Sequence, residues 1–160
     1  MYNVLQIMRG TTVDGPGFRT SIYLAGCNHR CPGCHNPSSW DPEGGNNMTL
    51  EEIMEIVEEE DFDVTLSGGD PLFSPSSTGR LVRALKQNGR NVWVFTGFRW
   101  EEIVSTPSLL DAVRGADVVV DGPFIEDKKD LDLLFRGSSN QRLIRVADSL
   151  QGGNITLYDS

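Results

Sequence analysis

The chain has 160 residues and a formal net charge of −9 at pH 7, and 38% of its residues are hydrophobic while 23% are charged. This balance is typical of a folded globular protein and not of a disordered one. The acidic surplus argues against a general surface for nucleic acid or anionic membranes, because both favour clustered Lys and Arg. The length predicts a single domain over residues 1–160.

No apolar run approaches the ~20 residues that a membrane-spanning helix needs. The first residues lack the basic and apolar regions of a signal peptide. The chain has three cysteines, and all of them lie in one short segment, which is more typical of reduced thiols than of a disulfide framework. We therefore expect a cytoplasmic protein that binds neither nucleic acid nor membranes.

Apolar runs that end in glycine alternate along the chain with segments of helical periodicity. From the N-terminus, the sequence predicts an edge strand (residues 4–8), a turn (12–17), a strand (18–24), a connector (42–47), a helix (49–60), a strand (64–67), a helix (78–88), a strand (92–96), helical turns (100–104 and 108–114) and a strand (118–121). The helix at 49–60 is the best marked, because Thr49 and Glu52 form a capping-box pattern.

The last third of the chain has a different pattern. Residues 126–130 predict a charged turn, and residues 131–134 predict a short helix. Residues 143–146 and 155–157 predict a terminal hairpin around Gly152 and Gly153.

Strands that alternate with helices predict an α/β fold with a mostly parallel sheet and with its loops gathered at one edge. A complete eight-fold β/α barrel needs about 250 residues. The chain is too short for that, so we expect a partial, open β/α barrel.

The cysteines Cys27, Cys31 and Cys34 have the spacing Cys-x3-Cys-x2-Cys. Thiolates select zinc, copper(I) or iron–sulfur clusters. A 4Fe-4S cluster held by protein alone uses four cysteines, so three would leave one iron open to a substrate or cofactor. Alternatively, His29 or His35 could supply the fourth ligand of a closed zinc site.

Polar residues also follow the later strands. Gly68-Gly-Asp-Pro71 follows residues 64–67, and its adjacent glycines would let the backbone approach a ligand closely. Pro71 restricts Asp70 to an extended conformation. Thr96 and Asp121 end the next two strands. Each of these residues is compatible with a ligand site and with an ordinary turn or helix cap.

The cysteine spacing resembles the signature of radical S-adenosylmethionine enzymes. The resemblance implies one 4Fe-4S cluster per chain on Cys27, Cys31 and Cys34, with S-adenosyl-L-methionine on the open iron. It also implies that Asp70 faces the ammonium group of that cofactor. The implied cofactor-binding residues are Gly33, Cys34, His35, Gly68, Gly69, Asp70, Thr96 and Asp121. Gly33 stands where many members of the superfamily carry an aromatic residue, so adenine must stack elsewhere.

Further segments narrow the resemblance. They are Asp14-Gly-Pro-Gly17, Cys31-Pro-Gly-Cys-His-Asn36 with Trp40, Phe95-Thr-Gly-Phe98, Val120-Asp-Gly-Pro-Phe124 and Phe135-Arg-Gly-Ser-Ser-Asn-Gln-Arg142. Together they resemble the anaerobic ribonucleoside-triphosphate reductase activating proteins. Residues 136–142 could contact the ligand, face the partner or stabilise the fold.

This family resemblance implies an oxidoreductase with a partial barrel of the radical S-adenosylmethionine type. Its chemistry would come from cofactors and not from a catalytic side chain. The enzyme would take an electron from a flavodoxin-like donor, cleave S-adenosyl-L-methionine reductively, and generate a glycyl radical on the large subunit of the reductase. Two alternatives remain: an activase of another glycyl-radical enzyme, such as pyruvate formate-lyase, and a non-enzymatic zinc-binding module.

Overall fold

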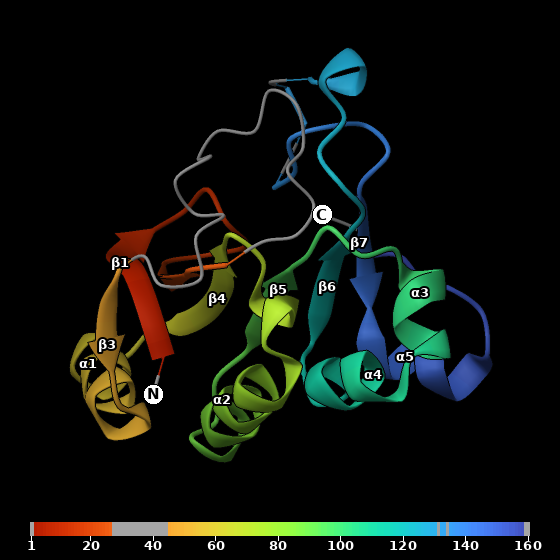
Figure 1. Cartoon of the computed structure of the whole chain (residues 1–160). Helices are drawn as coiled ribbons and strands as arrows, with labels where there is room; N and C mark the ends of the chain where they lie inside the picture. The colour runs from red at the N-terminus through yellow and green to blue at the C-terminus, as the bar shows by residue number, and fades with distance from the viewer. Residues whose placement is uncertain (1, 27–44, 131, 134, 159–160) are drawn as a thin grey trace.

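The computed structural model describes residues 2–26, 45–130, 132–133 and 135–158 (Figure 1). Within these residues the strands are β1 (Tyr2–Thr11), β2 (Arg19–Leu24), β3 (Asn46–Met48), β4 (Asp63–Gly68), β5 (Val92–Phe95), β6 (Val118–Asp121) and β7 (Arg142–Arg145). The helices are α1 (Leu50–Glu60), α2 (Pro75–Gln87), α3 (Trp100–Ser105), α4 (Pro107–Val113) and α5 (Val146–Gly152), with 3₁₀ turns η2 (Pro71–Phe73) and η3 (Glu126–Lys128). No described helix is long and apolar enough to cross a membrane.

The strands of the described residues form one mixed sheet in the order β3-β1-β2-β4-β5-β6-β7. The four central strands, β2, β4, β5 and β6, run parallel to one another. The outer strands β1, β3 and β7 pair antiparallel with their neighbours. The predicted α/β class is therefore confirmed, and the sheet is open because β3 and β7 form its two edges.

Two predictions for the N-terminal part are wrong. The edge strand expected at residues 4–8 is an interior strand, because β1 is flanked by β2 and β3. The end of the expected connector at residues 42–47 enters β3, which pairs with the start of β1. Edge strands of three residues have weak sequence signals, since pairing with a distant strand decides their conformation.

The helix predicted from the capping box is confirmed. Glu52 N donates to Thr49 Oγ1 (3.1 Å), and Thr49 N donates to Glu52 Oε1 (3.0 Å). The capping box thus satisfies two backbone N–H groups at the start of α1 that have no partner within the helix. The helix α2 begins three residues earlier than expected, at Pro75, which suits the first turn of a helix.

The predicted terminal hairpin is only partly present. Residues 143–146 and 155–157 do approach each other, since Ile144 forms an antiparallel bridge with Leu157. However, the connection between them contains helix α5 and not a tight turn, and Val146 at the start of α5 is buried in the core. In the segment 131–134, residues 131 and 134 lie outside the described residues, and the two between them form a turn and a bend.

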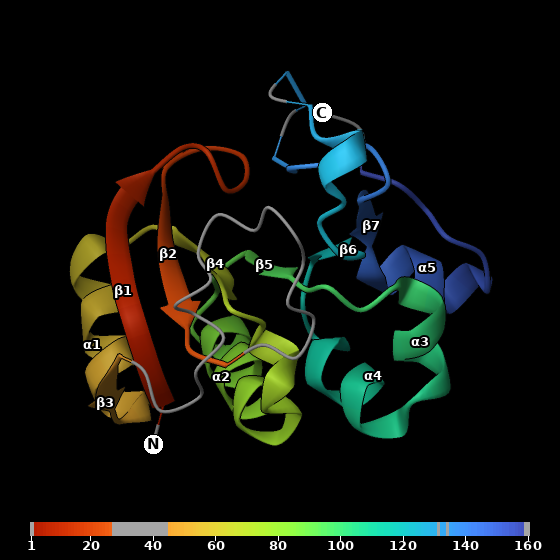
Figure 2. The ribbon, with the colours of Figure 1, turned by 45° about the horizontal axis from the view of Figure 1, so that its top comes forward.

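The two faces of the sheet differ. One face supplies the larger apolar cluster, in which strand residues such as Leu66 and Val94 pack with helix residues such as Leu81 and Ile103. Helices α1, α2 and α4 lie along the same side of the sheet (Figures 1 and 2). The opposite face carries a smaller cluster, formed by Trp93, Val118, Val120 and Leu143 with partly buried Phe95, Phe135 and Tyr158.

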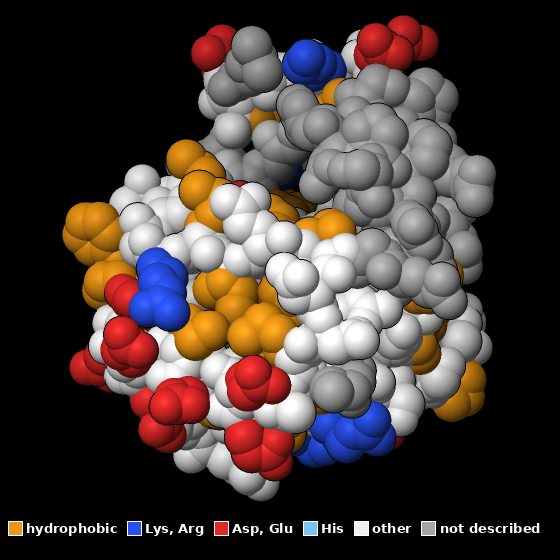
Figure 3. All heavy atoms as spheres, turned by 60° about the vertical axis from the view of Figure 1, so that its left-hand side comes forward, with side chains coloured by type: hydrophobic (Ala, Val, Ile, Leu, Met, Phe, Trp, Pro, Cys, Tyr) orange, Lys and Arg blue, Asp and Glu red, His pale blue; other side chains and the backbone are white. Residues whose placement is uncertain are grey.

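Helix α1 presents much of the negative charge to solvent. Acidic side chains gather on the side of the molecule where α1 lies (Figure 3). Arg9 of β1 pairs with Glu59 (3.4 Å) and Glu60 (3.0 Å), and these ion pairs are largely exposed. The acidic run at the end of α1 is therefore a solvated surface.

Arg19 is buried at the start of β2, where it is 1% exposed. Its Nε donates to Thr65 Oγ1 (2.9 Å), and its Nη2 donates to Val64 O (2.8 Å) and Asn91 O (3.1 Å). Its guanidinium also lies over the ring of Trp93, 5.6 Å from the centroid. Burial lowers the pKa of Arg19 from its ordinary value. This side chain joins the starts of three parallel strands.

Replacing Arg19 with Met tests this role. We expect Arg19→Met to lower the free energy of unfolding by about 3 kcal/mol, because buried acceptors on β4 and before β5 lose their donor. Arg9→Met is the matched control, with an expected change below about 1 kcal/mol because its ion pairs are exposed. Urea denaturation of both variants measures the difference, and equal losses would contradict the assignment.

Candidate functional site

The carboxyl ends of the parallel strands lie at one edge of the sheet, where α/β folds of this kind place their ligand sites. Gly26, Asp70, Thr96 and Asp121 all lie at or just after these strand ends. The predicted metal and cofactor residues Cys27, Cys31, Gly33, Cys34 and His35, and also His29, lie outside the described residues. The other predicted site residues are all described, namely Gly68, Gly69, Asp70, Thr96 and Asp121.

The ends of β2 and β4 approach each other very closely. Gly68 has a φ of +112°, and a Cβ atom added to it would lie 2.4 Å from both the backbone nitrogen and the oxygen of Leu24. No side chain fits there, so the backbone packing alone requires glycine at this position. Beyond this point, Gly69 N donates to Leu24 O (2.8 Å), and Asp70 N donates to Gly26 O (2.7 Å). The Gly68-Gly-Asp-Pro71 turn is thus in direct contact with Gly26, the residue that precedes Cys27.

Asp70 joins the end of β4 to the end of β5. It is 2% exposed, and its backbone is extended, as Pro71 predicts. Its Oδ1 accepts a hydrogen bond from Leu72 N (2.9 Å), which caps η2. Its Oδ2 accepts from Thr96 Oγ1 and from Gly97 N, both at 3.0 Å. Two of the predicted site residues, Asp70 and Thr96, are therefore hydrogen-bonded to each other.

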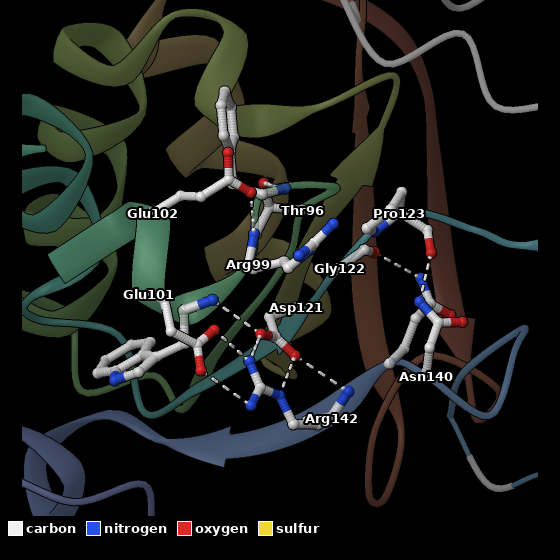
Figure 4. A network of polar contacts seen from close by, with 12 residues as sticks. Thr96, Arg99, Glu101, Glu102, Asp121, Gly122, Pro123, Asn140 and Arg142 are labelled. Carbon is white, nitrogen blue, oxygen red and sulfur yellow. Dashed lines mark hydrogen bonds and ion pairs between the residues drawn. The ribbon is translucent and has the colours of Figure 1, made fainter. Parts of the chain in front are cut away.

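Asp121 has different partners. It is 1% exposed, and Arg142 donates to it through its backbone N and Nε (3.1 Å each) and through Nη2 (2.6 Å). Trp100 N donates to the same carboxylate (2.8 Å). Arg142 also contacts Glu101 (2.8 Å), so it bridges β6 and α3 (Figure 4). These contacts direct the Asp121 carboxylate toward α3 and β7.

The electrostatics of this group follow from its geometry. Hydrogen bonding to Asp121, and then to Glu101, raises the pKa of Arg142 from its ordinary value. The hydrogen bond from Arg142 lowers the pKa of Glu101 from its ordinary value. Sequence reasoning did not identify Arg142 as the partner of Asp121, because the two residues lie 21 positions apart and on different strands.

Asp14 is a further polar group, which the sequence analysis placed in a turn and in a family motif but not among the site residues. Its carboxylate accepts from Tyr23 Oη (2.7 Å) and Ser21 Oγ (3.0 Å), and its backbone oxygen accepts from Thr65 Oγ1 (2.7 Å). Burial, and then the hydrogen bond to Asp14, raise the pKa of the Tyr23 phenol. The turn before β2 therefore folds back over β2 and β4.

The described residues contain no group of three or more His, Cys, Asp or Glu side chains that could hold a metal ion. Within that part of the chain, then, no second donor set competes with the three clustered cysteines. The described part of the chain is therefore an open mixed sheet with glycine-rich turns and a buried aspartate at its carboxyl edge, next to Gly26, which precedes the three cysteines in the sequence.

Comparison with known proteins shows the family to which the chain belongs. A family model described as a 4Fe-4S single cluster domain matches residues 13–144. The chain is 36% identical over 140 residues to the anaerobic ribonucleoside-triphosphate reductase-activating protein of Salmonella typhi, with 81% of this chain and 89% of the relative covered. The protein of that name from Escherichia coli K12 is 35% identical over 139 residues (81% and 89% covered), and that from phage T4 is 33% identical over 146 residues (86% and 90% covered).

These matches confirm the resemblance noted in the sequence. The chain belongs to the family of anaerobic ribonucleoside-triphosphate reductase-activating proteins, and it carries the 4Fe-4S single cluster domain.

The contacts of Asp121 predict a strong effect on stability. We expect Asp121→Ala to lower the free energy of unfolding by about 3 kcal/mol, because it leaves the buried Trp100 N without its acceptor and removes the buried one of the two carboxylates that Arg142 contacts. Asp111→Ala, at an exposed position on α4, is the control and should change stability by less than about 0.5 kcal/mol. If calorimetry finds the two variants equally stable, the Asp121–Arg142 contact does not hold β6 and β7 together.

Proposed function

We propose that this protein is a radical S-adenosylmethionine activase that generates the glycyl radical of anaerobic ribonucleoside-triphosphate reductase. The relatives are named for activating that reductase, which supports the choice of partner. The observation that carries the proposal is the hydrogen bond from Asp70 N to Gly26 O, because it joins the Gly68-Gly-Asp-Pro71 turn to the start of the cysteine segment. Gly26 and Asp70 lie 44 positions apart in the sequence, and their contact would bring the two motifs to one edge of the proposed site.

The donor set fits a 4Fe-4S cluster. Cys27, Cys31 and Cys34 offer three thiolates, and the matched 4Fe-4S domain spans all of them. These residues would hold one cluster per chain and leave one iron for S-adenosyl-L-methionine. When bound, the cluster would supply the electron for reductive cleavage of this cofactor, the chemistry by which a hydrogen atom would be removed from a glycine of the reductase. The donor of that electron would be a flavodoxin-like protein.

The protein would bind and orient the cofactor with residues at the carboxyl edge. The proposed set is Gly33, Cys34, His35, Gly68, Gly69, Asp70, Thr96 and Asp121. Asp70 places a buried negative charge there, and its bonds to β5 fix its direction, so an ammonium group beside it would be favoured. Asp121, held by Arg142, would keep the ends of β6 and α3 in place.

The open sheet supports a partial barrel of the radical S-adenosylmethionine type. A closed barrel would surround the cofactor, whereas a sheet with free edges leaves room for a glycine-bearing segment of the reductase. In this proposal residues 1–160 form a single domain of a cytoplasmic enzyme, and all redox chemistry comes from cofactors.

Radical formation on the partner tests the proposal directly. The reconstituted, reduced protein with S-adenosyl-L-methionine should give a glycyl radical signal in EPR when mixed with anaerobic ribonucleoside-triphosphate reductase. It should give none with pyruvate formate-lyase. Cys31→Ala should abolish the signal, because one thiolate of the cluster is lost. A signal on pyruvate formate-lyase alone would establish the alternative activase, and a Cys31→Ala protein with full activity would refute the cluster assignment.

Asp70→Ala tests the cofactor site separately from the cluster. We expect the iron content to be retained and the affinity for S-adenosyl-L-methionine to fall about tenfold or more, because a charge-assisted contact is worth at least about 1.4 kcal/mol. The affinity can be measured by equilibrium dialysis, with Asp148→Ala, exposed on α5, as the control. Unchanged affinity in a folded Asp70→Ala protein would remove Asp70 from the site.

A further inference from the structure

The connection between β6 and β7 rises beyond the carboxyl edge of the sheet (Figures 1 and 2). We call residues 123–130 and 135–139 of this connection the arm; the structure also describes residues 132–133 of the connection, and Gly122, Asn140 and Gln141 at its base. The tip of the arm is η3, in which no residue is buried, and residues 126–130 are all exposed. The tip carries Glu126, Asp127, Lys128, Lys129 and Asp130. Its charged side chains therefore face solvent beside the candidate site.

Both ends of the arm are tied together at its base. Gln141 Nε2 donates to Gly122 O (3.0 Å), while its Oε1 accepts from Gly137 N (2.9 Å) and Ser138 N (3.2 Å). Asn140 Nδ2 donates to Pro123 O (2.8 Å) (Figure 4). The Gln141 side chain thus contacts both the end of β6 and the segment that returns to β7, and the Asn140 side chain adds a further contact to the end of β6.

Further contacts fix the two halves of the arm to each other. Ser138 is fully buried, and its Oγ accepts from Ile125 N (3.3 Å). Ser138 also forms an antiparallel bridge with Lys129, and Ser139 N donates to Lys128 O (2.9 Å). Arg136 Nη1 donates to Gln141 O (2.6 Å). The arm is therefore held by hydrogen bonds that do not involve its tip side chains.

Phe135 is turned so that its ring anchors the arm in the sheet. Its φ is +61°, a conformation that is rare for a bulky residue. Its ring meets Trp93 edge-on, with the centroids 5.4 Å apart. Such strain persists only where the surroundings impose it, so the direction of the arm is set by its contacts and not by chain preference.

The sequence left the role of residues 136–142 open, and several of their polar side chains make contacts within the chain. The hydrogen bonds described above direct Arg136, Asn140, Gln141 and Arg142 onto the arm and the end of β6. The tip of the arm buries no residue, so it contributes little to the hydrophobic core. An exposed charged tip on a hydrogen-bonded base can present its charges to a partner in a defined position.

We propose that the arm is a docking element for the large subunit of the reductase. The tip charges would contact a polar surface of that subunit beside the segment that enters the candidate site, and Asn140 and Gln141 would act as positioning residues. This inference rests on the proposed function, because that function defines the partner. Charged groups at the rim of an interface mainly speed association and fix the relative position of the two proteins. Such a role suits an arm that would help to place the glycine of the reductase at the candidate site.

The test uses the full chain with Lys128→Glu and Lys129→Glu combined. We expect the Kd for the reductase to rise about tenfold, and glycyl radical formation at limiting reductase to fall accordingly. Cleavage of S-adenosyl-L-methionine by dithionite without the reductase should stay unchanged, since the tip does not touch the proposed cofactor residues. The matched control reverses two exposed arginines on the helices, Arg83→Glu with Arg114→Glu, and should leave all three quantities unchanged.

Gln141→Ala keeps the tip charges but loosens the base of the arm. It should also raise the Kd for the reductase while cofactor cleavage without the reductase persists. Wild-type affinity in the lysine double variant would overturn the proposal, as would an equal loss of affinity in the arginine control. Failure of the wild-type protein to cleave the cofactor would refute the proposed function instead, and the binding measurement separates that case from failure of the arm.

Discussion

The close backbone contact between the ends of β2 and β4 is the constraint on which the candidate site depends. Gly68 must lack a side chain because its α-carbon lies against the backbone of Leu24. That approach lets Gly69 and Asp70 continue the hydrogen bonding with Leu24 and Gly26 beyond the last strand residues. Gly26, the residue that precedes Cys27, therefore lies beside the Gly-Gly-Asp-Pro turn. The sequence suggested that Gly68 lets the backbone approach a ligand, but the packing of β4 against β2 already requires a glycine at this position.

Successive contacts extend this arrangement across the carboxyl edge of the sheet. The Asp70 carboxylate links the end of β4 to Thr96 and Gly97 after β5, and Arg142 links Asp121 at the end of β6 to Glu101 on α3. The buried Arg19 joins the opposite ends of the same strands. Both ends of the parallel strands are thus fixed by buried polar groups, while the edge strands leave the sheet open. Such a frame suits cofactor chemistry, for which the protein supplies orientation and access.

The sequence predicted the features that depend on local chemistry. The capping box of α1, the apolar parallel strands and the extended Asp70 before Pro71 all follow from neighbouring residues, and the structure agrees. Strand β3, the interior position of β1 and helix α5 were missed because distant pairing decides them. The strand-end rule brought Asp70, Thr96 and Asp121 to one edge, but it could not reveal that Asp70 bonds to Thr96 whereas Asp121 bonds to Arg142. The sequence left open whether residues 136–142 contact the ligand, face the partner or stabilise the fold, because the contacts of Asn140, Gln141 and Arg142 with the end of β6 join positions distant in the sequence.

EPR of the dithionite-reduced protein, reconstituted anaerobically with iron and sulfide, tests the central claim most directly. The spectrum should be recorded with and without S-adenosyl-L-methionine. We expect a reduced 4Fe-4S signal that changes shape when the cofactor is added, because the cofactor would bind the iron that lacks a cysteine. A protein that takes up no cluster and instead holds one tightly bound zinc per chain would contradict the account, since the three cysteines would then form a structural metal site.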